Sequence, residues 1–120
     1  MFKLAIPVLH VESSVVAEQF YCKRLGFRQD FAYRPFGGLD PCYMGLVRDE
    51  VELHASSFSG DGGPRGAAFI LVEDIDALHS ELVLKGVAID LAPTEQDWGN
   101  REMYVKDPDG NSIRFVQSRS

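Results

Sequence analysis

An internal duplication is the feature that most limits how this chain can fold. Residues 8–27 (VLHVESSVVAEQFYCKRLGF) and residues 69–87 (FILVEDIDALHSELVLKGV) share one order: an apolar strand, a Val-Glu pair, a helix and a glycine. The matching positions are Val11 and Val72, Glu12 and Glu73, and Gly26 and Gly86. Because self-similarity at a fixed spacing is the signature of a repeated unit, we expect one supersecondary motif built twice.

The first predicted helix has recognisable ends. Ser13 or Ser14 is placed to cap its N-terminus, since a side-chain oxygen at that point accepts a free backbone N–H. Val16 and Phe20 lie about one turn apart and are predicted to face inward. Gly26 follows Leu25 as the usual residue beyond a helix C-terminus.

The second predicted helix repeats this plan. Asp74 is its expected N-cap. An apolar stripe at helical spacing is expected to pack inward, formed by Ile75, Leu78 and Leu82. Lys85 and Gly86 end the helix.

Three short strand-like runs follow each helix. They lie near 27–34, 42–48 and 50–56, and again near 87–91, 101–106 and 111–117. The last pair is joined by DPDGN, in which Pro108 and Gly110 favour a tight turn. The sequence therefore predicts an α+β fold with two tandem β-α-β-β-β modules, each a curved sheet with a helix on one face and the other face open.

The two predicted modules are separated by a segment of linker composition. The stretch SSFSGDGGPRG (56–66) contains four glycines and a proline. We expect a single domain over residues 1–120, with module one at 1–57, a linker at 58–66 and module two at 67–120. Two open sheet faces, from two modules or from two chains, would enclose a cleft.

The net charge of −6 disfavours nucleic acid as a partner, because nucleic-acid binders usually carry a basic surface. It is compatible with a cationic ligand. No apolar run is long enough to cross a bilayer, and the N-terminus lacks a signal-peptide cleavage pattern. We therefore expect a cytoplasmic protein with reduced Cys22 and Cys42 and no membrane partner.

A candidate metal set consists of His10, Glu52 and His54. His10 alternates with Ile6 and Val8 on one strand, and His54 alternates with Glu52 on another. If both faces line one cleft, the three side chains converge, and His and Glu ligands suit a divalent metal. The alternative is ordinary polar residues near strand ends, since no tight spacing such as H-x-x-x-H is present. We expect no metal and no other cofactor.

Two aromatic residues stand outside the core pattern. Phe36 follows a proline and precedes two glycines, and Trp98, the single tryptophan, lies between Asp97 and Gly99. Such rings can stack on a flat ligand, and each aromatic pair adds roughly 0.5–1.5 kcal/mol beyond burial. Phe31 precedes Phe36 and shares a face with Tyr33, and the acids Asp30, Asp97 and Glu102 nearby would favour a cation. The alternative for Trp98 is that it seals the edge of a dimer.

Four segments together resemble bleomycin resistance proteins, within the glyoxalase or vicinal-oxygen-chelate superfamily. They are IPVL (6–9), RLGFRQDF (24–31), LVRDEVELHAS (46–56) and EQDWGNREMYVKDPDGNSIRFV (95–116), the last being the most specific. The resemblance implies the glyoxalase/bleomycin resistance/dioxygenase fold. It also implies a homodimer that exchanges its N-terminal strand near Pro7 and has two clefts between the chains.

The resemblance further implies a binding site for an antibiotic. Trp98 and Phe36 would sandwich the planar bithiazole of bleomycin. The cleft would be lined by Asp30, Phe31 and Ser56, with His54 where that family often has an aromatic residue. The implied function is sequestration of a planar cationic glycopeptide without catalysis. A departure is Arg34, which lies where resistance proteins tend to carry acids.

The metal enzymes of the same superfamily provide a contrast. Their ligand positions fall on Ile6, Ala67 and Arg114, and on Glu52 or His54 depending on the register. Two aliphatic side chains and a cation cannot bind a metal, and the resemblance suggests that Arg114 pairs with its pseudo-symmetric Glu52. We therefore expect no catalytic residues. The alternatives are a metal-dependent glyoxalase-like lyase or dioxygenase, and a relative that binds an unrelated metabolite.

Overall fold

The computed structural model describes residues 1–119 and confirms the duplicated architecture. In chain order, its elements are β1 (Val8–His10), α1 (Ser14–Glu18), a π-helical segment (Gln19–Arg24), β2 (Arg28–Tyr33), β3 (Tyr43–Arg48), β4 (Val51–Ser56), β5 (Ala67–Leu71), α2 (Ile75–Leu84), β6 (Ile89–Glu95), β7 (Arg101–Lys106) and β8 (Ser112–Gln117). The three strands expected after each helix are all present, and β6 runs further than predicted.

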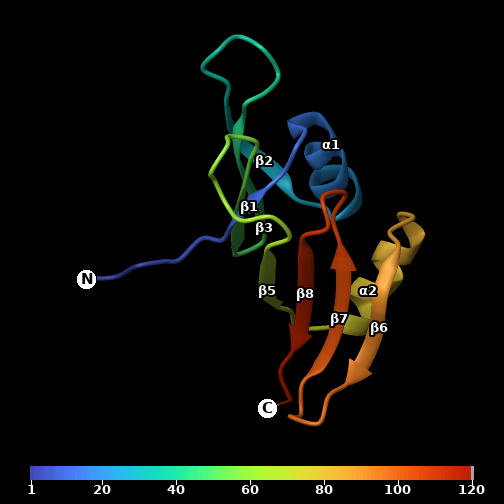
Figure 1. Cartoon of the computed structure of the whole chain (residues 1–120). Coiled ribbons are helices and arrows are strands. Elements are labelled where there is room, and N and C mark those ends of the chain that lie inside the picture. Colours follow the sequence, from blue (N-terminus) through green and yellow to red (C-terminus); the bar gives the residue numbers. More distant parts are fainter. Residues whose placement is uncertain (120) are drawn as a thin grey trace.

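Within residues 1–119 the strands form two four-stranded sheets, ordered β1-β4-β3-β2 and β5-β8-β7-β6 (Figure 1). We call them the first sheet and the second sheet. In each, the first pair is parallel and the other two pairs are antiparallel. The predicted α+β fold of two tandem β-α-β-β-β modules is thus confirmed.

The helix ends follow the sequence signals, and one inward position was predicted wrongly. The Ser13 hydroxyl accepts the N–H of Val16 at 3.2 Å, which caps α1. Val16 itself is exposed, and the inward positions are Ala17, Phe20 and Tyr21. The chain passes from α1 directly into a π-helical segment, so residues spaced for an ordinary helix do not all share one face.

The second helix matches its prediction. The Asp74 carboxylate accepts the N–H of Ala77 at 3.0 Å. Ile75 and Leu82 are fully buried against the second sheet. Full burial of one such side chain contributes about 1.5–3 kcal/mol, so this face of α2 holds it on the sheet. Gly86 ends the helix with a positive φ of 76°, which glycine adopts without strain.

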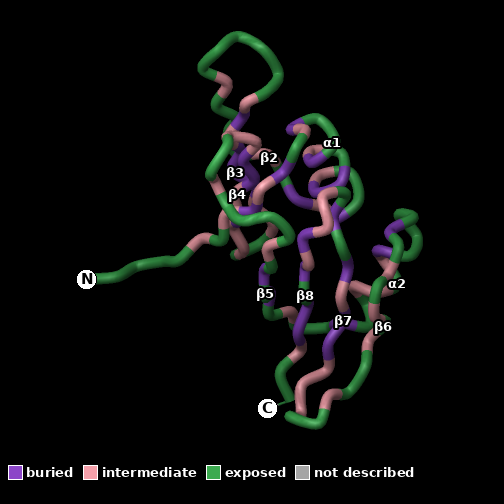
Figure 2. The backbone as a smooth tube through the Cα atoms, viewed as in Figure 1, coloured by how far each residue is buried: buried purple, intermediate pink, exposed green. Residues whose placement is uncertain are grey.

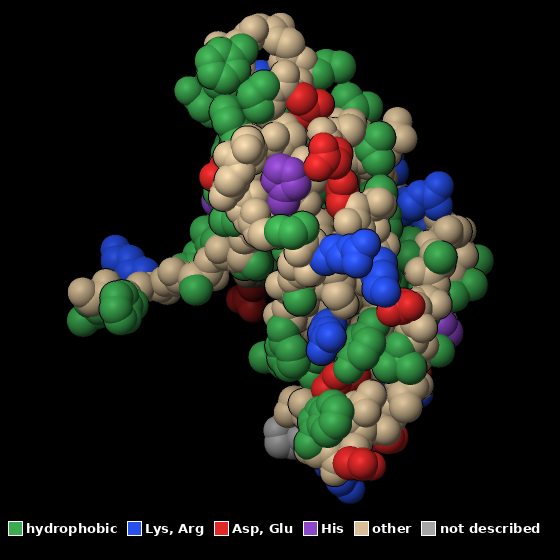
Figure 3. Space-filling model, viewed as in Figure 1, with side chains coloured by type: hydrophobic (Ala, Val, Ile, Leu, Met, Phe, Trp, Pro, Cys, Tyr) green, Lys and Arg blue, Asp and Glu red, His purple; other side chains and the backbone are tan. Residues whose placement is uncertain are grey.

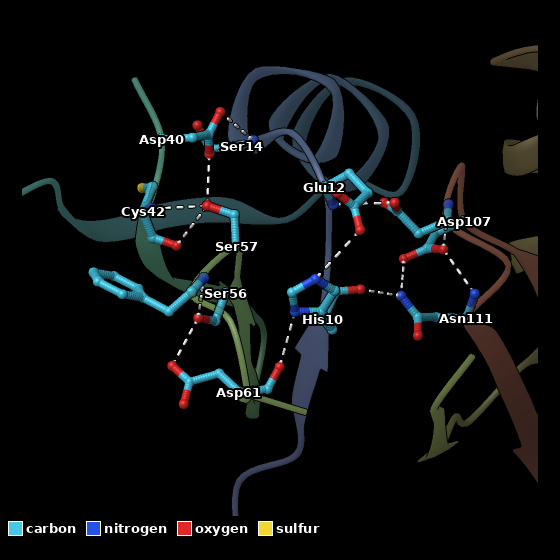
Figure 4. A network of polar contacts seen from close by, with 12 residues as sticks. His10, Glu12, Ser14, Asp40, Cys42, Ser56, Ser57, Asp61, Asp107 and Asn111 are labelled. Carbon is cyan, nitrogen blue, oxygen red and sulfur yellow. Dashed lines mark hydrogen bonds and ion pairs between the residues drawn. The ribbon is translucent and has the colours of Figure 1, made fainter. Parts of the chain in front are cut away.

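Polar bonds between buried groups join the two modules. Tyr21 donates its hydroxyl to Asp107 at 2.7 Å, and the Asn111 amide donates to both Asp107 and the carbonyl of His10 at 2.8 Å. Asp107 and Asn111 belong to the DPDGN turn between β7 and β8, so this turn connects module two to the π-helical segment through Tyr21 and to β1 through His10. Figure 4 shows the contact with His10. The buried residues of both modules form one core cluster (Figure 2).

The linker is packed against β1. The backbone oxygen of Asp61 bonds to Nδ1 of His10 at 3.0 Å. Gly62 has a φ of 68°, and an added Cβ would come within 2.8 Å of the His10 backbone nitrogen. Only glycine fits such a close backbone approach, so Gly62 serves packing against β1 as well as turning.

The N-terminal arm, residues 1–6, projects away from the body of the chain (Figures 1 and 3). Met1, Phe2 and Leu4 are exposed. Pairing with the first sheet begins at Pro7, whose carbonyl accepts the N–H of His54 at 2.9 Å. Among the described residues, no helix is long and apolar enough to span a bilayer.

Candidate functional site

Phe31 lies across the open face of the first sheet, the face that carries Tyr43, Glu52 and His54. Its neighbour on β3 is Gly45, where an added Cβ would meet the Phe31 ring at 2.2 Å. A glycine at this point is what lets the ring lie flat on the sheet. The ring stacks on Tyr43 at a centroid distance of 6.2 Å and is 40% exposed.

A hydrogen-bonded chain runs beside Phe31. Nε2 of His54 lies 2.9 Å from a Glu52 carboxylate oxygen, and its Nδ1 lies 2.8 Å from the Tyr43 hydroxyl. Because a carboxylate only accepts, the Nε2 that faces Glu52 carries a proton, and in the neutral imidazole Nδ1 then accepts from Tyr43. Burial raises the pKa of Tyr43, so its phenol stays protonated as a donor. The face thus presents a fixed pair of rings with a partly exposed carboxylate at its edge.

A second aromatic group lies at the end of the first sheet and comprises Tyr33, Phe36 and Phe58. Tyr33 stacks on Phe58 at 6.3 Å, and Phe36 lies against the same ring at 6.4 Å. Phe36 remains 76% exposed. The hydrophobic side chains on the β2–β3 loop project from this end of the molecule (Figure 3). Phe58 was missed by sequence reasoning because it stands in the linker, which folds back only in three dimensions.

Trp98 lies on the β6–β7 hairpin of module two. Its indole N–H donates to Glu102 at 2.7 Å, and the side chain is 65% exposed. Tyr104 donates its hydroxyl to the other Glu102 oxygen. The hydrogen bond to Glu102 is the largest cause that raises the pKa of Tyr104. Arg114 stacks over the Tyr104 ring at 4.8 Å from its centroid.

The two predicted walls of the stacking site do not meet in one chain. The β2–β3 loop that carries Phe36 and the β6–β7 hairpin that carries Trp98 lie at opposite ends of the molecule (Figure 1). No ring contact joins Phe36 to Trp98 within residues 1–119. A sandwich of one planar ligand between these rings therefore requires a second chain.

The remaining predicted site residues, Asp30, Ser56 and His10, lie in separate sets of contacts. Asp30 is exposed and lies 3.4 Å from Arg28, which is a weak surface pair. Ser56 is fully buried, and its hydroxyl donates to Asp61 at 2.8 Å. His10 contacts Asp61 on one side and Glu12 on the other, so the structure brings Glu52 and His54 together and holds His10 in a different network (Figure 4).

The positions at which the resemblance expects metal ligands of related enzymes can now be placed on the two sheets. No group of three or more His, Cys, Asp or Glu side chains within residues 1–119 is arranged to hold a metal ion. The strand registers place Val8 opposite His54 and Phe69 opposite Arg114. Since Val8 and Phe69 are equivalent in the duplication, the counterpart of Arg114 is His54. Within residues 1–119 no ion pair joins Arg114 to Glu52, contrary to expectation, and Arg114 stacks on Tyr104.

A hollow of about 380 Å³ lies between the modules, away from these aromatic groups. Its walls include Phe27, Ile70 and Phe115, and the ion pair of Arg48 with Glu81 crosses it. That ion pair satisfies both of its charges, but the carboxylates of Asp49, Glu50, Glu73 and Asp74 also line the hollow, so its rim is acidic. The open sheet faces hold the aromatic and titratable side chains, and we take them as the candidate site.

The duplicated fold leaves one open face with exposed aromatic side chains on each sheet. A family model described as a glyoxalase superfamily protein matches residues 1–120. The chain belongs to the glyoxalase superfamily. A search of curated protein sequences finds no match.

Several solved structures share the fold over nearly the full chain. The bleomycin resistance determinant encoded on transposon Tn5 is 25% identical with a TM-score of 0.80, covering 99% of this chain and 100% of that one. A bleomycin-binding protein complexed with bleomycin is 25% identical with a TM-score of 0.78, covering 98% and 99%. The bleomycin-binding protein of Streptomyces verticillus, complexed with copper(II)-bleomycin, is 30% identical with a TM-score of 0.73, covering 100% and 98%.

Proposed function

We propose that this protein is a non-catalytic binding protein that sequesters a planar, bleomycin-type glycopeptide in clefts formed between two copies of the chain. The observation that carries the proposal is the separation of two exposed aromatic walls. Phe36 and Trp98 are 76% and 65% exposed, yet they lie on loops at opposite ends of one chain. A second copy can bring its own Trp98 to Phe36 and complete the stacking site.

Several exposed apolar surfaces support the dimer. Phe69 and Leu71 on the edge strand β5 are 62% and 66% exposed. The N-terminal arm adds Phe2 and Leu4, whose side chains are largely exposed. Exposed apolar patches of this kind mark association surfaces. We therefore propose that the arm crosses to the partner at Pro7, and that the edge strands meet there.

The ligand class follows from the site and from the relatives. Flat aromatic walls select a planar group, and the net charge of −6 favours a cation. Two structural relatives at 25–30% identity are described as bound to bleomycin or copper(II)-bleomycin. Arg114 and the aliphatic residues Ile6 and Ala67 occupy the metal-ligand positions of the related enzymes, which favours binding over metal-dependent catalysis.

The direct test is titration with copper-free and copper-loaded bleomycin while following the fluorescence of Trp98. We expect saturable quenching near one drug per chain. Trp98→Ala has no tryptophan fluorescence, so its binding is followed by calorimetry, and we expect that binding to be lost. Absence of any change up to high micromolar drug would overturn the proposed ligand. A stoichiometric divalent metal in the purified protein, with a metal-induced rise in melting temperature, would instead favour a metal-dependent lyase or dioxygenase.

The dimer has its own test. Sedimentation at micromolar concentration is expected to give a dimer for the full chain. Deletion of residues 2–6 is expected to shift the population toward monomer, because it removes the apolar arm. A monomeric full chain would remove the two-copy cleft from the proposal.

A further inference from the structure

Glu102 is a buried acid on the open face of the second sheet. Only 3% of its surface is exposed, and no Lys, Arg or His within residues 1–119 pairs with it. Burial of a carboxylate away from a cation is costly unless other donors satisfy it. Its two oxygens accept one bond each from neutral donors, Trp98 and Tyr104. The carboxylate is therefore engaged with the two aromatic side chains and is not presented to solvent.

Both donors belong to the candidate site. The Trp98 ring is largely exposed, and its hydrogen bond to Glu102 at 2.7 Å fixes the nitrogen edge of the indole. The bond from Tyr104 holds the phenol ring on which Arg114 lies at 4.8 Å. One carboxylate thus sets the positions of an exposed indole and, through Tyr104, of a guanidinium. Fixing such groups before binding lowers the entropy lost when a ligand orders them.

We infer that Glu102 is a positioning residue that holds Trp98 as a pre-organised stacking wall on the second sheet. The part of this inference that concerns bleomycin rests on the proposed function. Glu102 acts through the indole N–H and is not placed to contact the ligand, because its side chain is buried and each oxygen already accepts a bond from an aromatic side chain. A carboxylate that bound a ligand cation directly would need an open oxygen on the surface.

The single tryptophan makes the test specific. In a ¹⁵N–¹H correlation spectrum of the labelled protein, one indole N–H signal reports on Trp98 alone. We expect this proton to exchange with water at least about tenfold more slowly in the folded protein than in the denatured chain, since it is hydrogen-bonded. An indole proton that exchanges equally fast in both states would overturn the inference without any variant.

Two substitutions separate the hydrogen bond from the charge. Glu102→Gln keeps an acceptor for the indole N–H, so slow exchange is expected to persist. Glu102→Leu removes both acceptors at similar volume. The freed donors can turn to water because Trp98 and Tyr104 are not fully buried, so the fold is expected to survive. In Glu102→Leu we expect exchange to accelerate at least tenfold and tryptophan fluorescence anisotropy to fall.

Glu95→Gln is the matched control, because Glu95 lies on the same hairpin and pairs at the surface with Arg101. It is expected to leave the indole signal unchanged. If Glu102 had a purely structural role, both Glu102 variants would have a lower melting temperature. The indole N–H would then exchange at the same rate in the wild type, in Glu102→Gln and in Glu102→Leu. That result would contradict the inference.

The effect of the same variants on ligand binding is measured with copper-free bleomycin. Affinity is expected to fall at least about tenfold in Glu102→Leu and to stay within about threefold in Glu102→Gln. If the wild type fails to bind bleomycin, the proposed ligand is wrong, and the exchange data still decide whether Glu102 positions Trp98. If binding weakens equally in both variants, the charge of Glu102 is what matters and the positioning role is refuted.

Discussion

The two modules share one strand order and differ in what their open faces present. In module one, Phe31 lies flat over Gly45 beside the chain of Tyr43, His54 and Glu52. In module two, the position equivalent to Gly45 is Tyr104, and Arg114 replaces His54. The face of module one is therefore built from stacked rings, and that of module two from an indole and a guanidinium around a buried acid.

This comparison teaches that the duplicated backbone is a scaffold and that the chemistry lies in the side chains of the open faces. The core faces remain alike, because each must cover a helix with apolar side chains. The open faces are free to diverge, since no helix within residues 1–119 covers them. A cleft that joins one face of each kind would present two different walls to a ligand.

The largest expected effect on stability distinguishes the β7–β8 turn of module two from the β3–β4 turn of module one. Asp107 accepts bonds from the Tyr21 hydroxyl, the Asn111 amide and the backbone N–H groups of residues 109 and 111. Asp107→Ala leaves these buried donors unsatisfied, so we expect a loss of about 3 kcal/mol or more in unfolding free energy, measured with urea.

The control for Asp107 is the corresponding turn of module one. Asp49 is exposed and has a φ of 52°, which asparagine tolerates. Asp49→Asn is expected to change stability by about 0.5 kcal/mol or less. Equal losses at both turns would show that the turn of module two does not join the modules.

The next effect tests the flat ring of module one. Gly45→Ala places a Cβ within 2.2 Å of Phe31, so the ring must move off the sheet and lose its stacking on Tyr43. We expect a loss of about 1–3 kcal/mol, with a changed aromatic environment in near-ultraviolet circular dichroism. Gly63→Ala meets no atom within 4 Å and is expected to be neutral or slightly stabilising. An unchanged Gly45→Ala would mean that Phe31 does not lie against β3.

A smaller effect concerns the ion pair at the joint of the modules. Arg48 holds Glu81 through two bonds of 2.8 and 2.9 Å, and this hydrogen bonding lowers the pKa of Glu81. A lowered pKa contributes stability above the ordinary carboxyl pKa of about 4.3, and the contribution is lost as pH falls through the lowered value. Because both side chains are partly exposed, we expect Glu81→Gln to lose only about 1 kcal/mol at pH 7.

The pH dependence distinguishes that ion pair from simple packing. The difference in unfolding free energy between the wild type and Glu81→Gln is expected to shrink as pH falls below the ordinary carboxyl pKa of about 4.3 and through the lowered pKa of Glu81. Asp90→Asn is the control, since Asp90 lies 3.9 Å from Lys106 at the surface. It is expected to show little change at any pH. A pH-independent difference for Glu81→Gln would contradict a role for its charge.

The smallest effect on stability concerns the exposed ring of module one. Phe36 is 76% exposed, so Phe36→Leu is expected to change unfolding free energy by about 0.5 kcal/mol or less. Affinity for bleomycin is expected to fall about tenfold in calorimetry, because one stacking wall is lost. Leu39→Ala, an exposed change in the same loop, is the control for both measurements. Unchanged affinity in Phe36→Leu would remove Phe36 from the proposed site.

Local signals in the sequence predicted the elements and most of their ends. Ser13 and Asp74 cap their helices as expected, because capping depends on residues only three positions apart. Val16 was placed on the wrong face, since the π-helical segment that follows α1 has no signature in the apolar pattern. Tyr43 and Phe58 were missed as site residues because their neighbours come from other strands and from the folded linker.

The sequence by itself determined the repeated β-α-β-β-β order, because apolar periodicity, caps and turn residues act over a few positions. Only the tertiary structure decided which side chains share a face and a hydrogen bond. Tyr21 and Asp107 are 86 positions apart, and the register of β4 against β1 places His54 opposite Val8. Such contacts depend on strand pairing and on the packing of the two modules, to which no local pattern points. That is why Glu102 could be read as one acid near Trp98, and only the fold joined it to the indole and to Tyr104.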